Sequence, residues 1–189
     1  MKNVRKDEAN EKQPQFQRVG TIDGKPLVRV YFNHSEEERE DISGEEEGKT
    51  HTVYLADFIE RKSNLTDATE VAKEELLEQI DQYDTSSAVN SFTLSGKEMW
   101  LPKETRVGLV NSITIEKAAG KETTVLWFDG EKYELPVDTA LQMLSALELY
   151  ALECYNVTAA HKARVLTLSD VSEIIAFNIE EGYPTKLNF

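Results

Sequence analysis

Three turns that contain glycine constrain this chain more than any other feature of its sequence. They are Asp23-Gly24, Ser95-Gly96 and Asp129-Gly130, and each separates two short segments rich in β-branched and aromatic residues. Asp-Gly and related dipeptides favour the tight turn of an antiparallel hairpin, because glycine adopts positive φ at no steric cost. The sequence therefore predicts three β-hairpins, with strands over residues 16–22 and 27–32, 91–94 and 98–101, and 123–128 and 132–135.

The first hairpin belongs to a small N-terminal antiparallel β-element that we expect over residues 14–60. Residues 51–55, HTVYL, alternate in polarity and are expected to return to the hairpin as a third strand. An element of this size is not robust alone, so we expect it to need a partner surface. Residues 1–13 are expected to be a flexible N-terminus.

An acidic stretch interrupts this β-element. Residues 34–48 contain eight acidic side chains and one basic side chain, Arg39, within a chain whose formal net charge is −14. Such a stretch has little apolar area to bury, so residues 34–49 are expected to form a mobile, solvated loop. The alternative is a cation-binding loop, although the stretch lacks the alternating acidic spacing and central glycine of an EF-hand.

Residues 61–87 are expected to form a helix followed by a linker. Thr66 is a suitable N-cap, and the helix is expected to run to about Gln82. Val71, Leu76, Leu77 and Ile80 form its apolar stripe. The polar residues 83–88 then predict a domain boundary, with a C-terminal domain over residues 88–189.

The C-terminal domain is expected to contain one long and two shorter helices. The first should begin after Pro102 and run from Lys103 to about Lys117, and the last should begin near Ser169. The expected inward side of the first helix consists of Val107, Val110, Ile113 and either Ile115 or Ala118. The fold class is thus α+β, with a small N-terminal β-element and a C-terminal domain of β-hairpins packed on helices.

The long helix is predicted over residues 137–164. Its flanks are also apolar, so it is either the central core element of a domain or partly an oligomer interface. We favour a homo-oligomer or an obligate partner, because the hairpins and shorter helices supply little surface to cover it. Its main stripe consists of Ala140, Leu144, Leu147, Ala151, Cys154 and Thr158.

Composition excludes several classes of partner. The chain has 35 Asp and Glu against 21 Lys and Arg, which argues against nucleic acid or an anionic membrane as a partner. Cys154 is the only cysteine, so no disulfide can form within the chain. The first 16 residues lack an apolar core and no 18-residue apolar run occurs, so we expect neither a signal peptide nor a membrane span.

The sequence offers no motif for catalysis, for a metal or for a cofactor, and none of the three is expected. Cys154 and His161 share one helix face, but seven residues separate them by about 10 Å, too far for a thiolate–imidazole pair. Glu148 and Glu153 are interpreted as solvent-facing. The aromatic residues of the later hairpins either pack on a helix, which we favour, or line a carbohydrate or peptide groove; they are Trp100, Trp127, Phe128 and Tyr133.

Residues 88–189 resemble an uncharacterised domain family of bacteriophage and prophage proteins, often encoded beside or within tail-fibre and tail-assembly genes. A second, shorter similarity joins residues 13–32 to what precedes this domain in phages of gut Bacteroidales. The family pattern falls on Trp100, Leu101, Arg106, Trp127, Asp129, Gly130, Cys154, His161, Gly182, Tyr183 and Pro184. We interpret these as residues that determine the fold, with the hairpin tryptophans buried on the long helix.

The resemblance implies a non-enzymatic structural protein of the phage tail, baseplate or fibre, whose partners are other tail proteins and copies of itself. It would then be located in the virion. The alternative is a tail-fibre assembly factor or chaperone that stays in the host cytoplasm. An enzyme or host-takeover factor is a third possibility, for which the chain offers no group of residues.

Overall fold

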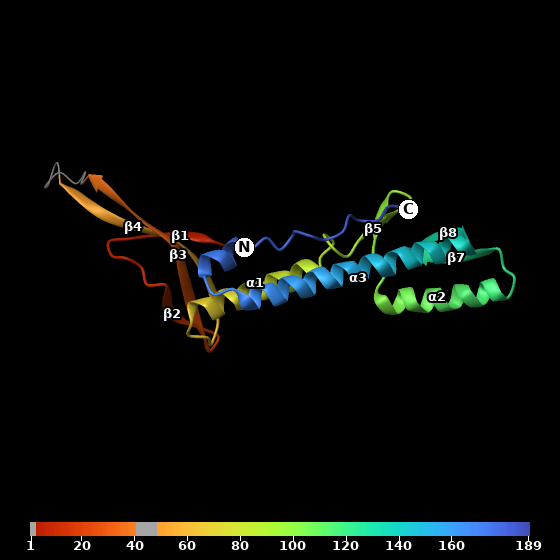
Figure 1. Cartoon of the computed structure of the whole chain (residues 1–189), viewed down its shortest axis with the longest axis horizontal. Helices are drawn as coiled ribbons and strands as arrows, with labels where there is room; N and C mark the ends of the chain where they lie inside the picture. The colour runs from red at the N-terminus through yellow and green to blue at the C-terminus, as the bar shows by residue number, and fades with distance from the viewer. Residues whose placement is uncertain (1–2, 41–48) are drawn as a thin grey trace. The chain divides into compact units, whose positions relative to one another are not determined.

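The computed structural model describes residues 3–40 and 49–189 (Figure 1). Within these residues the fold is α+β, as predicted, with a four-stranded antiparallel sheet, two further hairpins and four helices. The chain divides into two compact units. Unit 1 comprises Met1–Asp81 and His161–Ile179, and unit 2 comprises Gln82–Ala160 and Glu180–Phe189. Two of the three boundaries between them, after Asp81 and after Ala160, fall inside helices, and the third, after Ile179, follows the last helix.

The sheet of unit 1 has the strand order β1-β4-β3-β2. Its strands are β1 (Arg5–Ala9), β2 (Phe16–Ile22), β3 (Lys25–Glu40) and β4 (Thr50–Lys62). The predicted hairpin is formed by β2 and β3, and β4 returns antiparallel to β3, also as predicted. Asp23 and Gly24 both adopt positive φ, 53° and 76°, the backbone twist that a two-residue hairpin turn requires.

Two predictions for unit 1 are wrong in their bounds. Residues 5–9 are not a free N-terminus, because they pair with β4 from Arg5↔Phe58 to Ala9↔Tyr54. Residues 34–40 are not loop, because β3 continues through them and pairs with the start of β4, from Ser35↔Leu55 to Glu40↔Thr50. The remainder of the predicted acidic loop, apart from Lys49, lies outside the described residues.

Cross-strand partners explain how so acidic a segment can be a strand. The Arg39 guanidinium pairs with Glu37 on its own strand and, at 2.7 Å, with Glu8 on β1. The Thr52 hydroxyl donates a hydrogen bond of 2.8 Å to the Glu38 carboxylate. Only Glu38 and Thr52 are directly opposed, but all three contacts offset part of the repulsion between neighbouring glutamates.

Two helices cover one set of the sheet's apolar residues in unit 1, while Tyr31, Ala56 and Phe58 form a separate buried cluster. The two helices are α1 (Ala68–Asp84) and α4 (Val171–Ala176), and the end of the long helix α3 (Val137–Thr167) joins them. The predicted stripe of α1 is confirmed, since Val71, Leu76 and Ile80 are at most 1% exposed. The core consists of Val28, Val30, Phe32, Ile59, Ala68, Val71, Ala72, Leu76, Ile80, Val165, Leu168, Val171, Ile174 and Ile175.

The helix starts in unit 1 differ from the predicted caps by one residue. The Asp67 carboxylate, not the Thr66 hydroxyl, accepts the Glu70 N–H at 3.0 Å. Asp170 likewise replaces Ser169 and accepts the Glu173 N–H at 3.0 Å. In both cases a carboxylate caps the helix, and its charge also suits the positive end of the helix dipole.

Unit 2 contains the two later hairpins, the helix α2 (Lys103–Ala118) and most of α3. The hairpins are β5 (Phe92–Leu94) with β6 (Lys97–Met99), and β7 (Thr123–Phe128) with β8 (Glu131–Pro136). Both turns again carry two residues of positive φ, Ser95-Gly96 and Asp129-Gly130. The main core consists of Phe92, Leu94, Met99, Leu101, Ile113, Leu126, Phe128, Val137, Ala140, Met143, Leu144 and Leu147.

The last three residues of the chain add to this unit in a way that the sequence did not predict. Thr93 of β5 donates its N–H to the Leu187 carbonyl at 2.9 Å and accepts the Phe189 N–H at 2.8 Å. Ser95 donates its N–H to the Phe189 carbonyl at 2.9 Å. Residues 187–189 therefore lie parallel to β5, and the Phe189 ring contacts Phe92 with centroids 5.9 Å apart.

Candidate functional site

Three residues of the family pattern, Trp100, Leu101 and Arg106, meet where α2 begins. Arg106 is 5% exposed, and its Nη1 donates to the Leu101 carbonyl at 2.6 Å. Its Nε donates to the Glu148 carboxylate of α3 at 2.9 Å, and its guanidinium carbon lies 5.1 Å from the centre of the Trp100 ring. One buried cation thus ties the end of a hairpin to α3.

Trp100 also contacts Tyr150 of α3, edge to face, with ring centroids 6.3 Å apart. The Tyr150 hydroxyl donates to the buried Val89 carbonyl at 2.7 Å. Burial raises the pKa of Tyr150 well above its usual value, because the phenolate would be desolvated. Cys154 lies in the same cluster, and burial likewise raises the pKa of its thiol, which favours the interpretation of Cys154 as a packed residue.

Gly182 and Tyr183 serve the same part of unit 2. The Thr158 hydroxyl donates its one proton to the Asp84 carboxylate at 2.6 Å. It therefore accepts the hydrogen bond from the Tyr183 hydroxyl, which lies 2.7 Å away. The Tyr183 ring also packs edge to face on Tyr83. Gly182 has a φ of 85°, which other residues rarely adopt. This chain of contacts holds the C-terminal segment in place, and Pro184, half-buried, follows it.

His161 does not belong to this group. It lies in unit 1, where its ring packs edge to face on Phe177, with centroids 5.3 Å apart. Cys154, in contrast, packs in unit 2 against Val89 and Tyr150. The two residues therefore occupy separate environments. Glu148 is also accounted for, because it pairs with Arg106.

The two tryptophans of the chain have different surroundings. Trp100 is packed as described, but Trp127 on β7 is 65% exposed, so the prediction that both are buried on the long helix is wrong. The β7 burial pattern gives the reason, because Thr124, Leu126 and Phe128 point inward and Trp127 falls on the outer face. The Trp127 side chain borders a pocket of about 320 Å³ that Trp100, Leu109 and Leu126 also line.

The predicted inner face of α2 is right at Ile113, which is buried, and wrong at Val107, Val110 and Ile115, which are exposed. The other buried residue of the helix is Arg106, which was not predicted to face inward. A sequence pattern that counts only apolar residues cannot find this face, because its first buried position is a charged one. The Trp100-Leu101 pair just before the helix, which offers an aromatic ring and a carbonyl, is the available signal.

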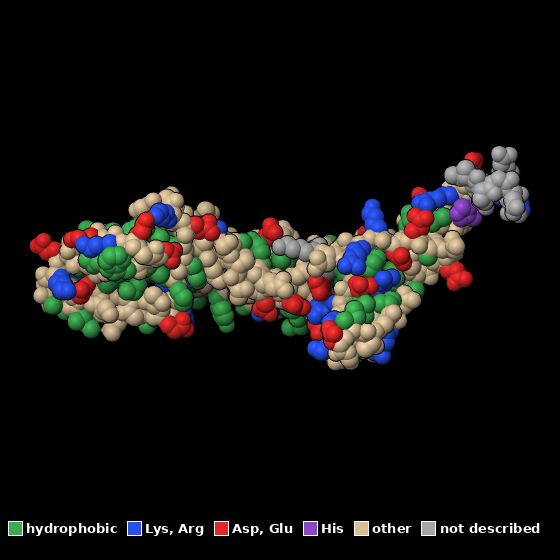
Figure 2. Space-filling model, turned by 180° about the vertical axis from the view of Figure 1, so that it is seen from behind, with side chains coloured by type: hydrophobic (Ala, Val, Ile, Leu, Met, Phe, Trp, Pro, Cys, Tyr) green, Lys and Arg blue, Asp and Glu red, His purple; other side chains and the backbone are tan. Residues whose placement is uncertain are grey.

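Unit 2 exposes several large apolar side chains, and Figure 2 shows hydrophobic side chains in separate groups on the visible face of the molecule. Between α2 and α3 lies a groove of about 460 Å³. It is lined by the apolar residues Val107, Val110 and Leu144 and by the polar residues Arg106, Asn111, Thr114, Ser145 and Glu148. We call the following set the apolar surface of unit 2: Val107, Val110, Ile115, Val125, Trp127, Leu149, Leu152 and Tyr155, each 36–67% exposed.

The described residues do not contain a group of three or more His, Cys, Asp or Glu side chains placed to hold a metal ion. Within the same residues, every helix is too short or too polar to cross a membrane. No protein-family model, curated protein or solved structure matches the chain.

Proposed function

We propose that this chain is a non-enzymatic structural protein of a bacteriophage tail, baseplate or fibre, and that it assembles through the apolar surface of unit 2. The apolar surface is the observation that carries the proposal. Leu149, Leu152 and Tyr155 on α3 are 54–67% exposed, and Val107 and Val110 on α2 border the groove. Large exposed apolar areas of this kind mark protein contacts in soluble proteins.

The resemblance to phage tail-associated domains supplies the biological setting for such a contact. Its pattern residues behave as the proposal requires, because most of them build the fold instead of lining a reactive site. Arg106 joins a hairpin to α3, Tyr183 anchors the C-terminal segment, and Gly130 forms a turn. Trp127 differs, since it projects into solvent and belongs to the contact surface.

The first partner that we propose is another copy of the chain, with other tail proteins joining the assembly. A specific contact should bury more than about 1,000 Å² in total. Light scattering on the purified chain tests this, and a mass of several chains at tens of micromolar is expected. A mass of one chain under those conditions would contradict self-association.

The location of the protein decides between the main proposal and the alternative. The same apolar surface could hold an unassembled fibre subunit, as in a cytoplasmic assembly factor. Mass spectrometry of purified virions from the phage or induced prophage that encodes the chain is the experiment. A stoichiometric amount in the particles supports a virion component, whereas its absence from particles, with a stable complex to a fibre protein in the lysate, supports the assembly factor.

A further inference from the structure

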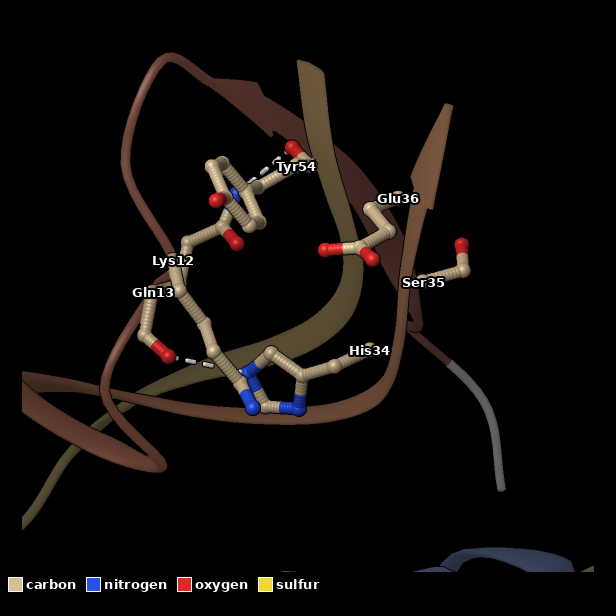
Figure 3. A pocket seen from close by; sticks show the side chains of 6 residues that line it. All are labelled: Lys12, Gln13, His34, Ser35, Glu36 and Tyr54. Carbon is tan, nitrogen blue, oxygen red and sulfur yellow. Dashed lines mark hydrogen bonds between the residues drawn. The ribbon is translucent and has the colours of Figure 1, made fainter. Parts of the chain in front are cut away.

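A polar pocket of about 250 Å³ lies in unit 1, far from the residues of the family pattern in the sequence (Figure 3). It forms at a β-bulge. The register changes between Phe32↔Asp57 and Ser35↔Leu55, which leaves Asn33 and His34 opposite one residue of β4. The pocket is lined by Lys12, Gln13, His34, Ser35, Glu36 and Tyr54.

Gln13 is held firmly although it lies in the connection between β1 and β2. It is 7% exposed, and its Nε2 donates to the Tyr54 carbonyl at 3.3 Å. The backbone carbonyl of Gln13 accepts a hydrogen bond of 3.0 Å from the His34 Nε2–H. The side-chain amide cannot be turned over, because its oxygen would then face the Tyr54 carbonyl.

This arrangement leaves one buried acceptor without a donor. The Gln13 Oε1 makes no hydrogen bond among the described residues. Figure 3 shows that the Gln13 amide and the Glu36 carboxylate extend from opposite sides into the same open space. A buried carbonyl without a donor is costly and uncommon in native proteins, so this acceptor is available to a donor that enters the pocket.

We propose that this pocket binds an organic cation, namely a primary ammonium or guanidinium group. Such a group donates several hydrogen bonds and carries the charge that a carboxylate stabilises, so one cation can satisfy Gln13 Oε1 and Glu36 together. The ring of Tyr54, on the pocket wall, adds an aromatic face and a hydroxyl. The group is carried either by a small molecule or by a Lys or Arg side chain of another protein.

The charges around the pocket favour a cation over an anion. Glu37, Glu38 and Glu40 follow Glu36 on β3, with Arg39 as the one basic side chain among them, so the strand stays net negative within a chain of net charge −14. Lys12 and His34 could attract an anion, but that anion would face the Glu36 carboxylate and the Gln13 carbonyl oxygen. A divalent metal is less suited, because Ca²⁺ takes six to eight oxygen ligands and Mg²⁺ demands a near-octahedral set.

The test is a titration of the full chain with methylguanidinium and ethylammonium, followed by NMR through the Gln13 side-chain amide. We expect the Gln13 signals to shift in a saturable way. Glu36→Gln should weaken binding by about tenfold, because it removes a charge-assisted hydrogen bond. Glu40→Gln is the matched control, because it removes the same charge from the same strand, and it should change affinity by less than about twofold.

A second variant guards against a change of fold. Gln13→Met keeps the side-chain volume and removes the acceptor, so it should weaken binding of the cation while the backbone spectrum outside the pocket is retained. To separate the two sources, an arginine-containing peptide and free arginine amide are compared. Tighter binding of the peptide indicates a protein partner, and equal binding indicates a small molecule.

Three results would overturn the proposal. The first is no saturable shift at Gln13 up to tens of millimolar cation, which would mean that only water fills the pocket. The second is an equal effect of Glu36→Gln and Glu40→Gln, which would indicate unspecific attraction to an acidic strand. The third is a stronger response to Ca²⁺ or Mg²⁺ than to either organic cation.

Discussion

The two units dispose of their large apolar side chains in different ways. In unit 1, α1 and α4 cover the sheet, and the exposed apolar residues Val4, Ile22, Leu65 and Leu166 come from four separate places in the chain. In unit 2, nine large apolar residues are exposed. Eight of them make up the surface defined above, of which six lie on α2 and α3, and the ninth is Phe189. A two-stranded hairpin covers less of a helix than a four-stranded sheet does.

The two units therefore differ in how much of their apolar surface they cover. Unit 1 buries most of its large apolar residues and has a polar pocket. Unit 2 is held together by a few polar anchors, of which Arg106 is the most buried, and it leaves apolar side chains in water. Both tryptophans lie in unit 2, so their fluorescence reports its unfolding separately from unit 1.

The largest effect on unit 2 should come from Arg106→Met. Methionine fills much of the same space but cannot donate to the buried Leu101 carbonyl or to Glu148. We expect a loss of about 2–3 kcal/mol in the free energy of unfolding, because a buried acceptor loses its donor. Urea unfolding followed by tryptophan fluorescence measures it.

Glu148→Gln is the control for Arg106. Glutamine keeps an oxygen that can accept the Arg106 Nε–H, and the Glu148 carboxylate is 48% exposed, so only a solvent-screened charge is lost and the loss should stay below about 1 kcal/mol. Equal losses in the two variants would show that the charge of Glu148, and not the buried hydrogen bond to Leu101, accounts for what Arg106 contributes.

Alkaline pH should destabilise unit 2. Burial raises the pKa values of Tyr83, Tyr150 and Tyr183 in the folded protein, so the unfolded chain loses these protons first. The tyrosines therefore leave stability unaffected below their unfolded pKa of about 10 and lower it as pH rises above that value. The buried Cys154 thiol, whose pKa is also raised, adds to the fall from an unfolded pKa of about 8.5. Urea midpoints between pH 8 and pH 11 measure the fall.

Tyr150→Phe should flatten this pH dependence, because the group that must ionise is gone, although the lost bond to Val89 lowers stability at all pH values. Tyr155→Phe is the matched control on the same helix. Tyr155 is 67% exposed, so its substitution should leave the pH dependence as it is in the unchanged chain. A pH profile that is the same in both variants would contradict a role for Tyr150.

Substitutions of Cys154 should have a smaller effect. The thiol is 4% exposed, so Cys154→Ser buries a hydroxyl in an apolar cluster and should cost about 1–3 kcal/mol. Cys154→Ala should cost less, because it adds no polar group. Thermal unfolding of the two variants measures the difference, and rapid labelling of the native thiol by a maleimide would contradict the packed role.

The elements that the sequence predicted correctly are those that depend on neighbouring residues. The hairpin turns at Gly24, Gly96 and Gly130 require only a local dipeptide, and α3 requires only a repeating stripe over many turns. The expected absence of a cofactor and the expected phage tail role differ from these elements, because both stay predictions.

The elements that it missed depend on distant residues. Glu8 and Arg39, 31 positions apart, help to keep an acidic segment in a strand. Which face of α2 is buried depends on Arg106, whose hydrogen-bond partner Glu148 lies 42 positions later in the sequence. Residues 187–189 form hydrogen bonds with β5, which most of the sequence of unit 2 separates from them. Gln13 becomes part of a pocket only through its hydrogen bonds with Tyr54 and His34. No local pattern contains such pairings.

The smallest effect on stability, and the sharpest test of the difference between the units, should come from Leu152→Ser. Leu152 is 54% exposed on α3, so its loss should change the free energy of unfolding by less than about 0.5 kcal/mol. If the apolar surface of unit 2 mediates self-association, the same substitution should shift the mass measured by light scattering towards one chain.

Leu166→Ser is the matched control, since it is the same change on the same helix at 61% exposure, but in unit 1. It should leave the mass unchanged, because Leu166 lies outside the apolar surface of unit 2. An equal loss of association in both variants would mean that any exposed leucine of α3 contributes to a general stickiness. A loss in Leu166→Ser alone would move the contact to unit 1 and leave the surface of unit 2 without its proposed role.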